Sequence, residues 1–225
     1  ELADDRAEAE EAAFEAFIDL LSSVASLPED QVLRGLADLV RAMVRCDYYL
    51  GNPAIAFKIE SAKVAHMPAP RPMFEIGVSS PQVEGVHLRG GKVARGGIRW
   101  SDRPDDFRTE VLGLMKTQMT KNVVIVPVGS KGGFVVKRPP SDREELRAFV
   151  EAQYRVYVRA LLGLTDNLVG GEVVHPAGLV IHDGPDPYLV VAADKGTATF
   201  SDTANTVAAE VGFWLGDAFA SGGSV

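Results

Sequence analysis

Buried strands and amphipathic helices alternate in the second half of the chain, and this alternation constrains the fold more than any other feature. Residues 123–128 (VVIVPV) and 188–194 (YLVVAAD) are largely apolar on both faces, which is typical of strands inside a covered sheet. Apolar residues recur at helical spacing within 102–122, 141–163 and 201–215. The alternation predicts an α/β domain with a mixed, partly parallel sheet flanked by helices.

The first half of the chain changes its period from helical to extended. Apolar residues recur every three or four positions as far as Val44, so we expect the first fifty residues to be helical. A period of two follows in 54–60 and 73–78, which predicts two strands, and Gly90-Gly91 is a candidate hairpin turn. We therefore expect a helical segment at 1–50 that packs on an α/β domain at 51–225.

Composition excludes several classes of protein. The 225 residues are 46% hydrophobic, which is enough for a substantial core. No apolar run approaches the roughly 18 residues of a membrane span, and the acidic N-terminus does not resemble a signal peptide. The single Cys46 excludes an intrachain disulfide, and the four histidines lack the spacing of metal ligands. We expect a cytoplasmic protein with no metal and no membrane association.

Charge is distributed unevenly along the chain. Residues 1–20 hold eight acidic residues and one arginine, whereas residues 95–137 hold eight Lys/Arg and four Asp/Glu. This local positive charge lacks the dense basic run and interleaved aromatics of a nucleic-acid site. A small anionic ligand therefore suits this positive charge better than a nucleic acid does.

Three charged residues lie in glycine-rich stretches, two of them directly after predicted buried strands. Lys131 lies in GSKGG after 123–128, Asp194 lies in ADKG at the end of 188–194, and Arg95 precedes Gly96 in ARGG. Ligands of α/β sheets bind at the carboxyl ends of parallel strands, and glycines let the backbone approach a ligand closely. Taken alone, a lysine in a glycine-rich turn is most often a solvated surface residue, and an aspartate at a strand end most often caps the following turn. Their conjunction favours one pocket for an anion.

Two blocks of the sequence carry a family resemblance. The stretches GKVARGGIRWSDRPDDFRTEVLGLMKTQMTKNVVIVPVGSKGGF and DPYLVVAADKGTATFSD strongly resemble the large NAD-dependent glutamate dehydrogenases of bacteria. The similarity runs from about residue 30 to the end. It implies a substrate-binding catalytic domain at 51–225. It also implies that an NAD-binding Rossmann domain follows residue 225, and no GxGxxG fingerprint occurs within the 225 residues.

The resemblance implies roles for the catalytic pair. Lys131 in GSKGG matches the family's catalytic lysine in a GGxKGG-like loop, with one glycine altered, and Asp194 matches the catalytic aspartate. Burial and neighbouring cations both favour the neutral form of a lysine, so Lys131 is expected to activate water or the carbonyl oxygen. Asp194 is expected to exchange protons with the substrate nitrogen.

The resemblance also implies the substrate-binding residues. Lys121 in MTKN matches the lysine that holds the α-carboxylate, with Gln118 close by. RGGIRW places Arg95 and Gly96 at the side-chain carboxylate, where the family carries lysine; Lys92 is the other candidate for this role.

The implied reaction is the NAD-dependent oxidation of L-glutamate to 2-oxoglutarate and ammonia, in a homo-oligomer. Two alternatives stay open. One is a dehydrogenase of another amino acid, which a substrate panel would distinguish. The other is a fragment without catalytic activity that binds a ligand or serves in assembly.

Overall fold

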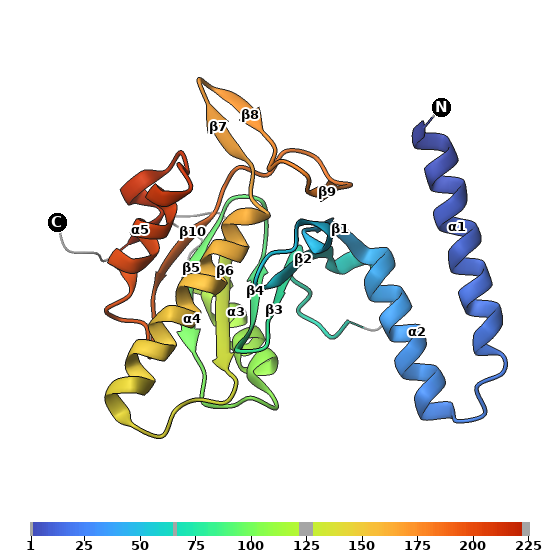
Figure 1. Ribbon diagram of the computed structural model, residues 1–225, viewed down its shortest axis with the longest axis horizontal. Helices are drawn as coiled ribbons and strands as arrows, with labels where there is room; N and C mark the ends of the chain where they lie inside the picture. Colours follow the sequence, from blue (N-terminus) through green and yellow to red (C-terminus); the bar gives the residue numbers. More distant parts are fainter. Residues whose placement is uncertain (1, 65–66, 122–127, 222–225) are drawn as a thin grey trace. The chain divides into compact units, whose positions relative to one another are not determined.

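The computed structural model describes residues 2–64, 67–121 and 128–221, with the side chains of 2–4, 6 and 119–121 left out of the description (Figure 1). The chain divides into two compact units. The first comprises Glu1–Ala42 with Lys63–His66, and the second comprises Met43–Ala62 with Met67–Val225.

The first unit is a pair of helices, α1 (Leu2–Leu21) and α2 (Leu27–Ala42). Arg41 joins them, because its Nη2 lies 2.5 Å from Glu11 Oε2 and its guanidinium lies 4.1 Å from the centre of the Phe14 ring. The prediction of helix through residue 50 is wrong beyond Ala42, where the chain enters a strand. The helical period continued to Val44 because a short buried strand contributes apolar residues of its own.

The second unit contains a mixed sheet. Its strands among the described residues are β1 (Met43–Cys46), β2 (Ile55–Glu60), β3 (Phe74–Ser79), β4 (Val83–Arg89), β5 (Ala94–Trp100), β6 (Val128–Val136), β9 (Val180–Ile181), β10 (Val190–Ala193) and β11 (Ala220–Ser221). Their order is β11-β10-β5-β6-β4-β3-β2-β1-β9. The pairs from β11 to β6 are parallel and the pairs from β6 to β9 are antiparallel. The predicted fold class is therefore confirmed.

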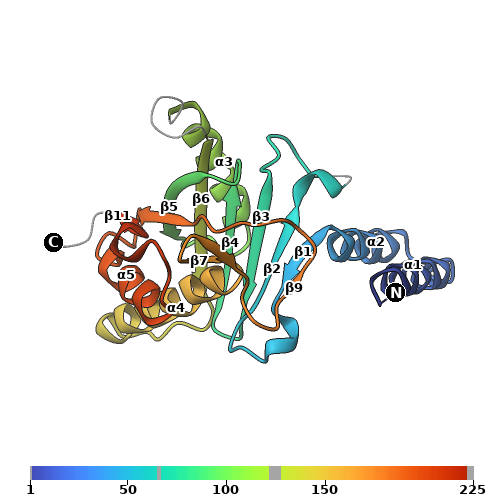
Figure 2. The ribbon, with the colours of Figure 1, turned by 90° about the horizontal axis from the view of Figure 1, so that it is seen from above.

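Helices cover both faces of this sheet (Figure 2). On one face lie α4 (Arg143–Gly163) and α5 (Ser201–Glu210), and Phe134 of β6 packs there against Tyr154 and Tyr157. The other face is covered by α3 (Phe107–Lys121), whose Val111 and Met115 join a separate apolar cluster with Leu88 and Val135. Helix α4 begins after Asp142, which caps it by accepting hydrogen bonds from the Glu144 and Glu145 amides.

The predicted hairpin at Gly90-Gly91 does not form. Strands β4 and β5 are not neighbours, because β6 lies between them, antiparallel to β4 and parallel to β5. The Gly90 amide donates to the Gly129 carbonyl at 3.0 Å, so the turn carries the chain across the end of β6. A glycine pair can form a hairpin turn or a connection that crosses another strand, and the position of β6 determines which of the two forms.

The glycine-rich stretch around Lys131 is a strand and not a loop after a strand. Residues 123–127 of the predicted strand lie outside the described residues, and β6 contains the whole GSKGG sequence. A Cβ added at Gly132 would lie 3.0 Å from Tyr157 Oη of α4, and one at Gly133 would lie 2.4 Å from Val111 Cγ2 of α3. These glycines let helices approach the central strand from both sides.

A buried ion network ties the segment after α4 to the antiparallel half of the sheet. Its cations are Arg45, Lys58 and Arg89, and its carboxylates are Asp166, Asp183 and Asp186. Arg89 also donates to the Tyr188 carbonyl at 3.0 Å, just before β10 begins. The network therefore fixes the start of the strand that delivers Asp194.

The remaining elements are short. A separate hairpin is formed by β7 (Asn167–Val169) and β8 (Glu172–Val174), and 3-10 turns occupy η1 (Tyr48–Leu50), η2 (Ser61–Lys63) and η3 (Gly216–Ala218). Within the described part of the chain, none of the helices combines the length and apolar character needed to cross a bilayer.

Candidate functional site

Lys131 and Asp194 form an ion pair on the α3 face of the sheet. Lys131 is the fourth residue of β6 and is 6% exposed, and its Nζ donates to Asp194 Oδ2. Asp194 directly follows β10, where its Oδ1 accepts from the Lys195 amide at 2.7 Å. Thr197 Oγ1 fixes this turn by donating to the Ile98 carbonyl at 2.6 Å. Two residues 63 positions apart are thus brought together across β5.

Arg99 and Glu110 extend this pair, and the sequence reasoning did not assign them to the site. Arg99 Nε lies 3.5 Å from Asp194 Oδ2, and its Nη1 donates to Glu110 Oε1 at 2.9 Å. Ser101 Oγ donates to the other oxygen of Glu110 at 2.6 Å. Alternation along β5 places Arg95 and Arg99 on one face, which is the signal that the sequence offered.

Both carboxylates of this cluster are held ionised. Burial raises the pKa of Asp194, but the hydrogen bond from Lys131, the Lys195 amide and the charge of Arg99 outweigh it, so the net pKa is lowered. Burial likewise raises the pKa of Glu110, and hydrogen bonds from Ser101 and Arg99 bring it below the usual value. Arg99 therefore lies between two carboxylates that stay ionised at neutral pH.

Three of the predicted substrate-binding residues lie near the start of β6. Arg95 is exposed and opposite Gly129 in the parallel pairing of β5 with β6. Gln118 of α3 packs over Gly129, since a Cβ added to that glycine would lie 3.0 Å from Gln118 Cγ. Gly96 is buried, and a Cβ there would lie 1.6 Å from the Ser130 carbonyl oxygen, so packing alone requires glycine. Lys121 ends α3, and its side chain lies outside the described residues.

Lys92, the other candidate for the side-chain carboxylate, is directed elsewhere. Its Nζ donates to the Pro185 carbonyl at 3.1 Å, beside the loop that carries Asp186. Arg95 shares a strand face with Arg99, whereas Lys92 lies before β5 begins. This placement favours Arg95 over Lys92.

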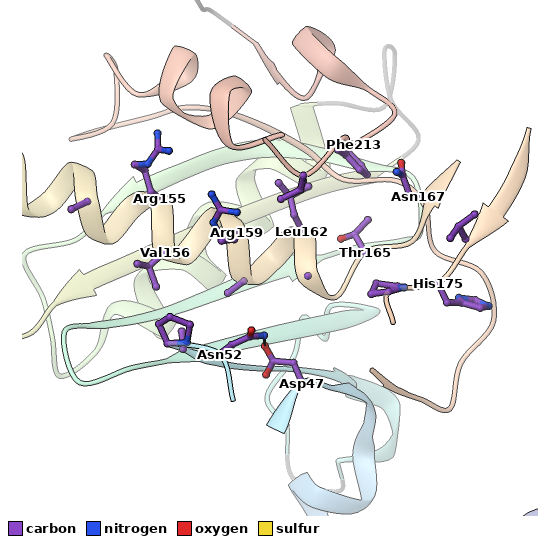
Figure 3. Close-up of a pocket in the computed structure, with 18 residues that line it drawn as sticks. Asp47, Asn52, Arg155, Val156, Arg159, Leu162, Thr165, Asn167, His175 and Phe213 are labelled. Atoms are coloured by element: carbon purple, nitrogen blue, oxygen red, sulfur yellow. Dashed lines mark hydrogen bonds between the residues drawn. The ribbon is translucent and has the colours of Figure 1, made fainter. Parts of the chain in front are cut away.

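A cavity of about 650 Å³ lies against α4 and does not include the Lys131–Asp194 pair (Figure 3). Several of its polar groups are already bonded within the protein. Asp47 accepts from the Ala56 amide at 2.7 Å, and Asn167 accepts from the Trp214 amide at 2.9 Å. Arg155 and Arg159 on its wall both pair with Glu210. Asp47, Asn167, Arg155 and Arg159 thus already have partners within the protein, so we place the candidate site at the buried ion pair of Lys131 and Asp194.

Comparisons with known proteins identify the family of this chain. Residues 16–225 match the family described as bacterial NAD-glutamate dehydrogenase, catalytic domain. The NAD-specific glutamate dehydrogenase of Halomonas elongata is 59% identical over 213 residues, which is 91% of this chain and 13% of that protein. The enzyme of the same name from Pseudomonas aeruginosa is 58% identical over 218 residues, covering 93% of this chain and 14% of that protein.

A solved structure gives a weaker likeness. The hetero-hexameric glutamate dehydrogenase of Thermus thermophilus, in its leucine-bound form, aligns with a TM-score of 0.42 and 19% identity over 89% of this chain and 44% of that one. The chain spans 13% and 14% of the length of the two curated relatives. The match over residues 16–225 shows that the chain belongs to the bacterial NAD-glutamate dehydrogenase catalytic-domain family.

Proposed function

We propose that the protein containing this chain oxidises L-glutamate to 2-oxoglutarate and ammonia with NAD, and that this chain supplies the substrate site. The observation that carries the proposal is the buried ion pair of Lys131 with Asp194, flanked on the same sheet face by Arg99 and by the exposed Arg95. Cations on one face of the sheet suit a dicarboxylate, because each charge pairing is stronger where water is scarce.

The roles proposed for these residues are those that the family resemblance implies. Arg95 and Lys121 bind the two carboxylates of the substrate and hold its Cα in one orientation, which removes much of the entropic cost of reaction. Lys131 acts on the water or carbonyl oxygen during hydrolysis of the iminium, and Asp194 moves protons to and from the nitrogen. Gln118 and the Gly96 backbone line the same end of β6. Arginine keeps its charge, so it suits binding at position 95, whereas the proton-transfer position requires lysine.

NAD, when bound, supplies the hydride acceptor, but the residues of this chain do not fit a dinucleotide. The sequence has no GxGxxG fingerprint. The parallel strand β5 leads into α3 through Asp102, Asp105 and Asp106, and carboxylates at a helix N-terminus oppose a pyrophosphate. We assign the cofactor to a part of the protein outside these 225 residues. A homo-oligomeric state and a cytoplasmic location belong to the same proposal, and light scattering of the purified enzyme tests the first.

Kinetics of the full-length enzyme test the proposal. In Lys131→Ala we expect kcat with glutamate and NAD to fall by roughly 10²–10⁴-fold, with an unchanged circular dichroism spectrum. Arg95→Ala is expected to lose its preference for glutamate over amino acids with one carboxylate, while Lys92→Ala keeps it. Retention of more than about a tenth of kcat in Lys131→Ala contradicts the assignment of this lysine. If the wild-type enzyme prefers an amino acid with one carboxylate, the assignment of glutamate as its substrate is wrong.

A further inference from the structure

We propose that Arg99 is a positioning residue, anchored by Glu110, that holds Asp194 aligned and ionised when Lys131 turns from Asp194 to the substrate. This inference rests on the proposed function of the Lys131–Asp194 pair. It assigns a task to two side chains that are not themselves placed against the substrate.

The first support is that one carboxylate oxygen serves two cations. Asp194 Oδ2 accepts from Lys131 Nζ and lies 3.5 Å from Arg99 Nε. Arg99 Nε is buried and has no hydrogen-bond partner among the described residues. A buried donor without a partner costs free energy, so this N–H is poised to bond to Oδ2 once Lys131 leaves it.

The second support is that Arg99 is held independently of Asp194. Its Nη1 donates to Glu110 Oε1 at 2.9 Å, and Ser101 Oγ holds Glu110 Oε2 at 2.6 Å. The Ser101 amide in turn donates to the Phe134 carbonyl of β6 at 2.9 Å. The side chains of Arg99 and Glu110 are only 19% and 14% exposed. This chain of bonds fixes the guanidinium relative to the central strand, whereas Lys131 reaches Asp194 on a flexible four-carbon stem.

The third support is the positive charge of Arg99 beside Asp194. Among the described residues, Lys131 from β6 and Arg99 from β5 face Asp194, Glu110 from α3 is bonded to Arg99, and the exposed Arg95 lies further along β5. When Lys131 engages the substrate, a partly buried Asp194 left alone would tend to take up a proton. Arg99 remains within a few ångströms and keeps the carboxylate charged, so Asp194 stays able to accept a proton from the substrate nitrogen.

The test is the pH dependence of the full-length enzyme with glutamate and NAD, comparing wild type, Arg99→Gln and Arg99→Lys. The kcat profile reports groups in the substrate complex, and the kcat/KM profile reports groups in the free enzyme. In Arg99→Gln we expect the acidic limb of kcat to move up by about one pH unit, since a nearby cation lowers a carboxyl pKa by roughly one to three units. The acidic limb of the kcat/KM profile should move less, because Lys131 still faces Asp194 in the free enzyme.

Arg99→Lys keeps the charge but loses the planar fork, so its limb should stay near that of wild type while kcat falls. Arg103→Gln is the matched control, since this arginine pairs with Asp106 at the surface, and it should leave both limbs in place. Arg99→Gln with a lowered kcat and an unmoved acidic limb would overturn the proposal, because a purely structural residue acts in that way. If Arg99→Gln does not fold, an Arg99→Lys enzyme with wild-type kcat and limb also overturns it. Activity of the wild-type enzyme on glutamate, and its loss in Lys131→Ala, test the proposed function separately.

Discussion

A buried histidine makes the stability of this domain depend on pH. His87 of β4 is 1% exposed, and neither of its ring nitrogens has a hydrogen-bond partner among the described residues. Burial, together with the charge of Arg89, lowers its pKa to about 3, although Asp186 acts in the opposite direction. The folded chain therefore holds His87 neutral through the range in which an unfolded histidine takes up a proton.

The sign of the effect follows from proton uptake. Between about pH 6.5 and pH 3 the unfolded state binds the proton and the folded state does not, so stability is lost as the pH falls. The slope approaches about 1.4 kcal/mol per pH unit below the unfolded pKa, and from pH 7 to pH 5 the loss from this one group is about 2 kcal/mol. His87→Leu removes the titrating group, so this part of the pH dependence should disappear.

Urea unfolding of the 225-residue chain at pH 7 and pH 5 measures the difference, with fluorescence of Trp100 and Trp214 as the signal from the second unit. Leu88→Met is the matched control, because Leu88 is fully buried next along the same strand and carries no titrating group. We expect the control to lose as much stability as wild type and His87→Leu to lose about 2 kcal/mol less. Equal losses in wild type and His87→Leu would refute the assignment of a neutral, unpartnered His87.

Two further substitutions test the packing and the ion network, each by urea unfolding at pH 7. Gly96→Ala should cost about 3 kcal/mol or more, because its Cβ would lie 1.6 Å from the Ser130 carbonyl oxygen; Gly113→Ala on α3, where nothing lies within 4 Å, should instead stabilise by roughly 1 kcal/mol. Equal effects would contradict the close approach of β5 to β6. Asp186→Asn should cost roughly 3–5 kcal/mol, since Arg89 and Lys58 would remain buried without their shared carboxylate. A cost below about 1 kcal/mol would show that these cations find other partners.

The sequence predicted the α/β class, because periodicity reports which faces of each local segment are apolar. It also singled out Lys131 and Asp194, which the fold brings into an ion pair. Strand order was not predictable in the same way. Gly90-Gly91 has the composition of a hairpin turn, and only the later strand β6, inserted between β4 and β5, makes it a crossing.

The sequence by itself therefore determined the fold class, the family resemblance and the candidate catalytic pair, since these depend on local pattern and on motifs that can be read directly. Only the tertiary structure decided that GSKGG is a central strand, because the helices α3 and α4 require its glycines for close packing. Only the tertiary structure linked Arg99 to Asp194, which lie 95 positions apart. Such contacts depend on which strands become neighbours, and strand neighbours are chosen by the packing of the whole sheet rather than by any local stretch of sequence.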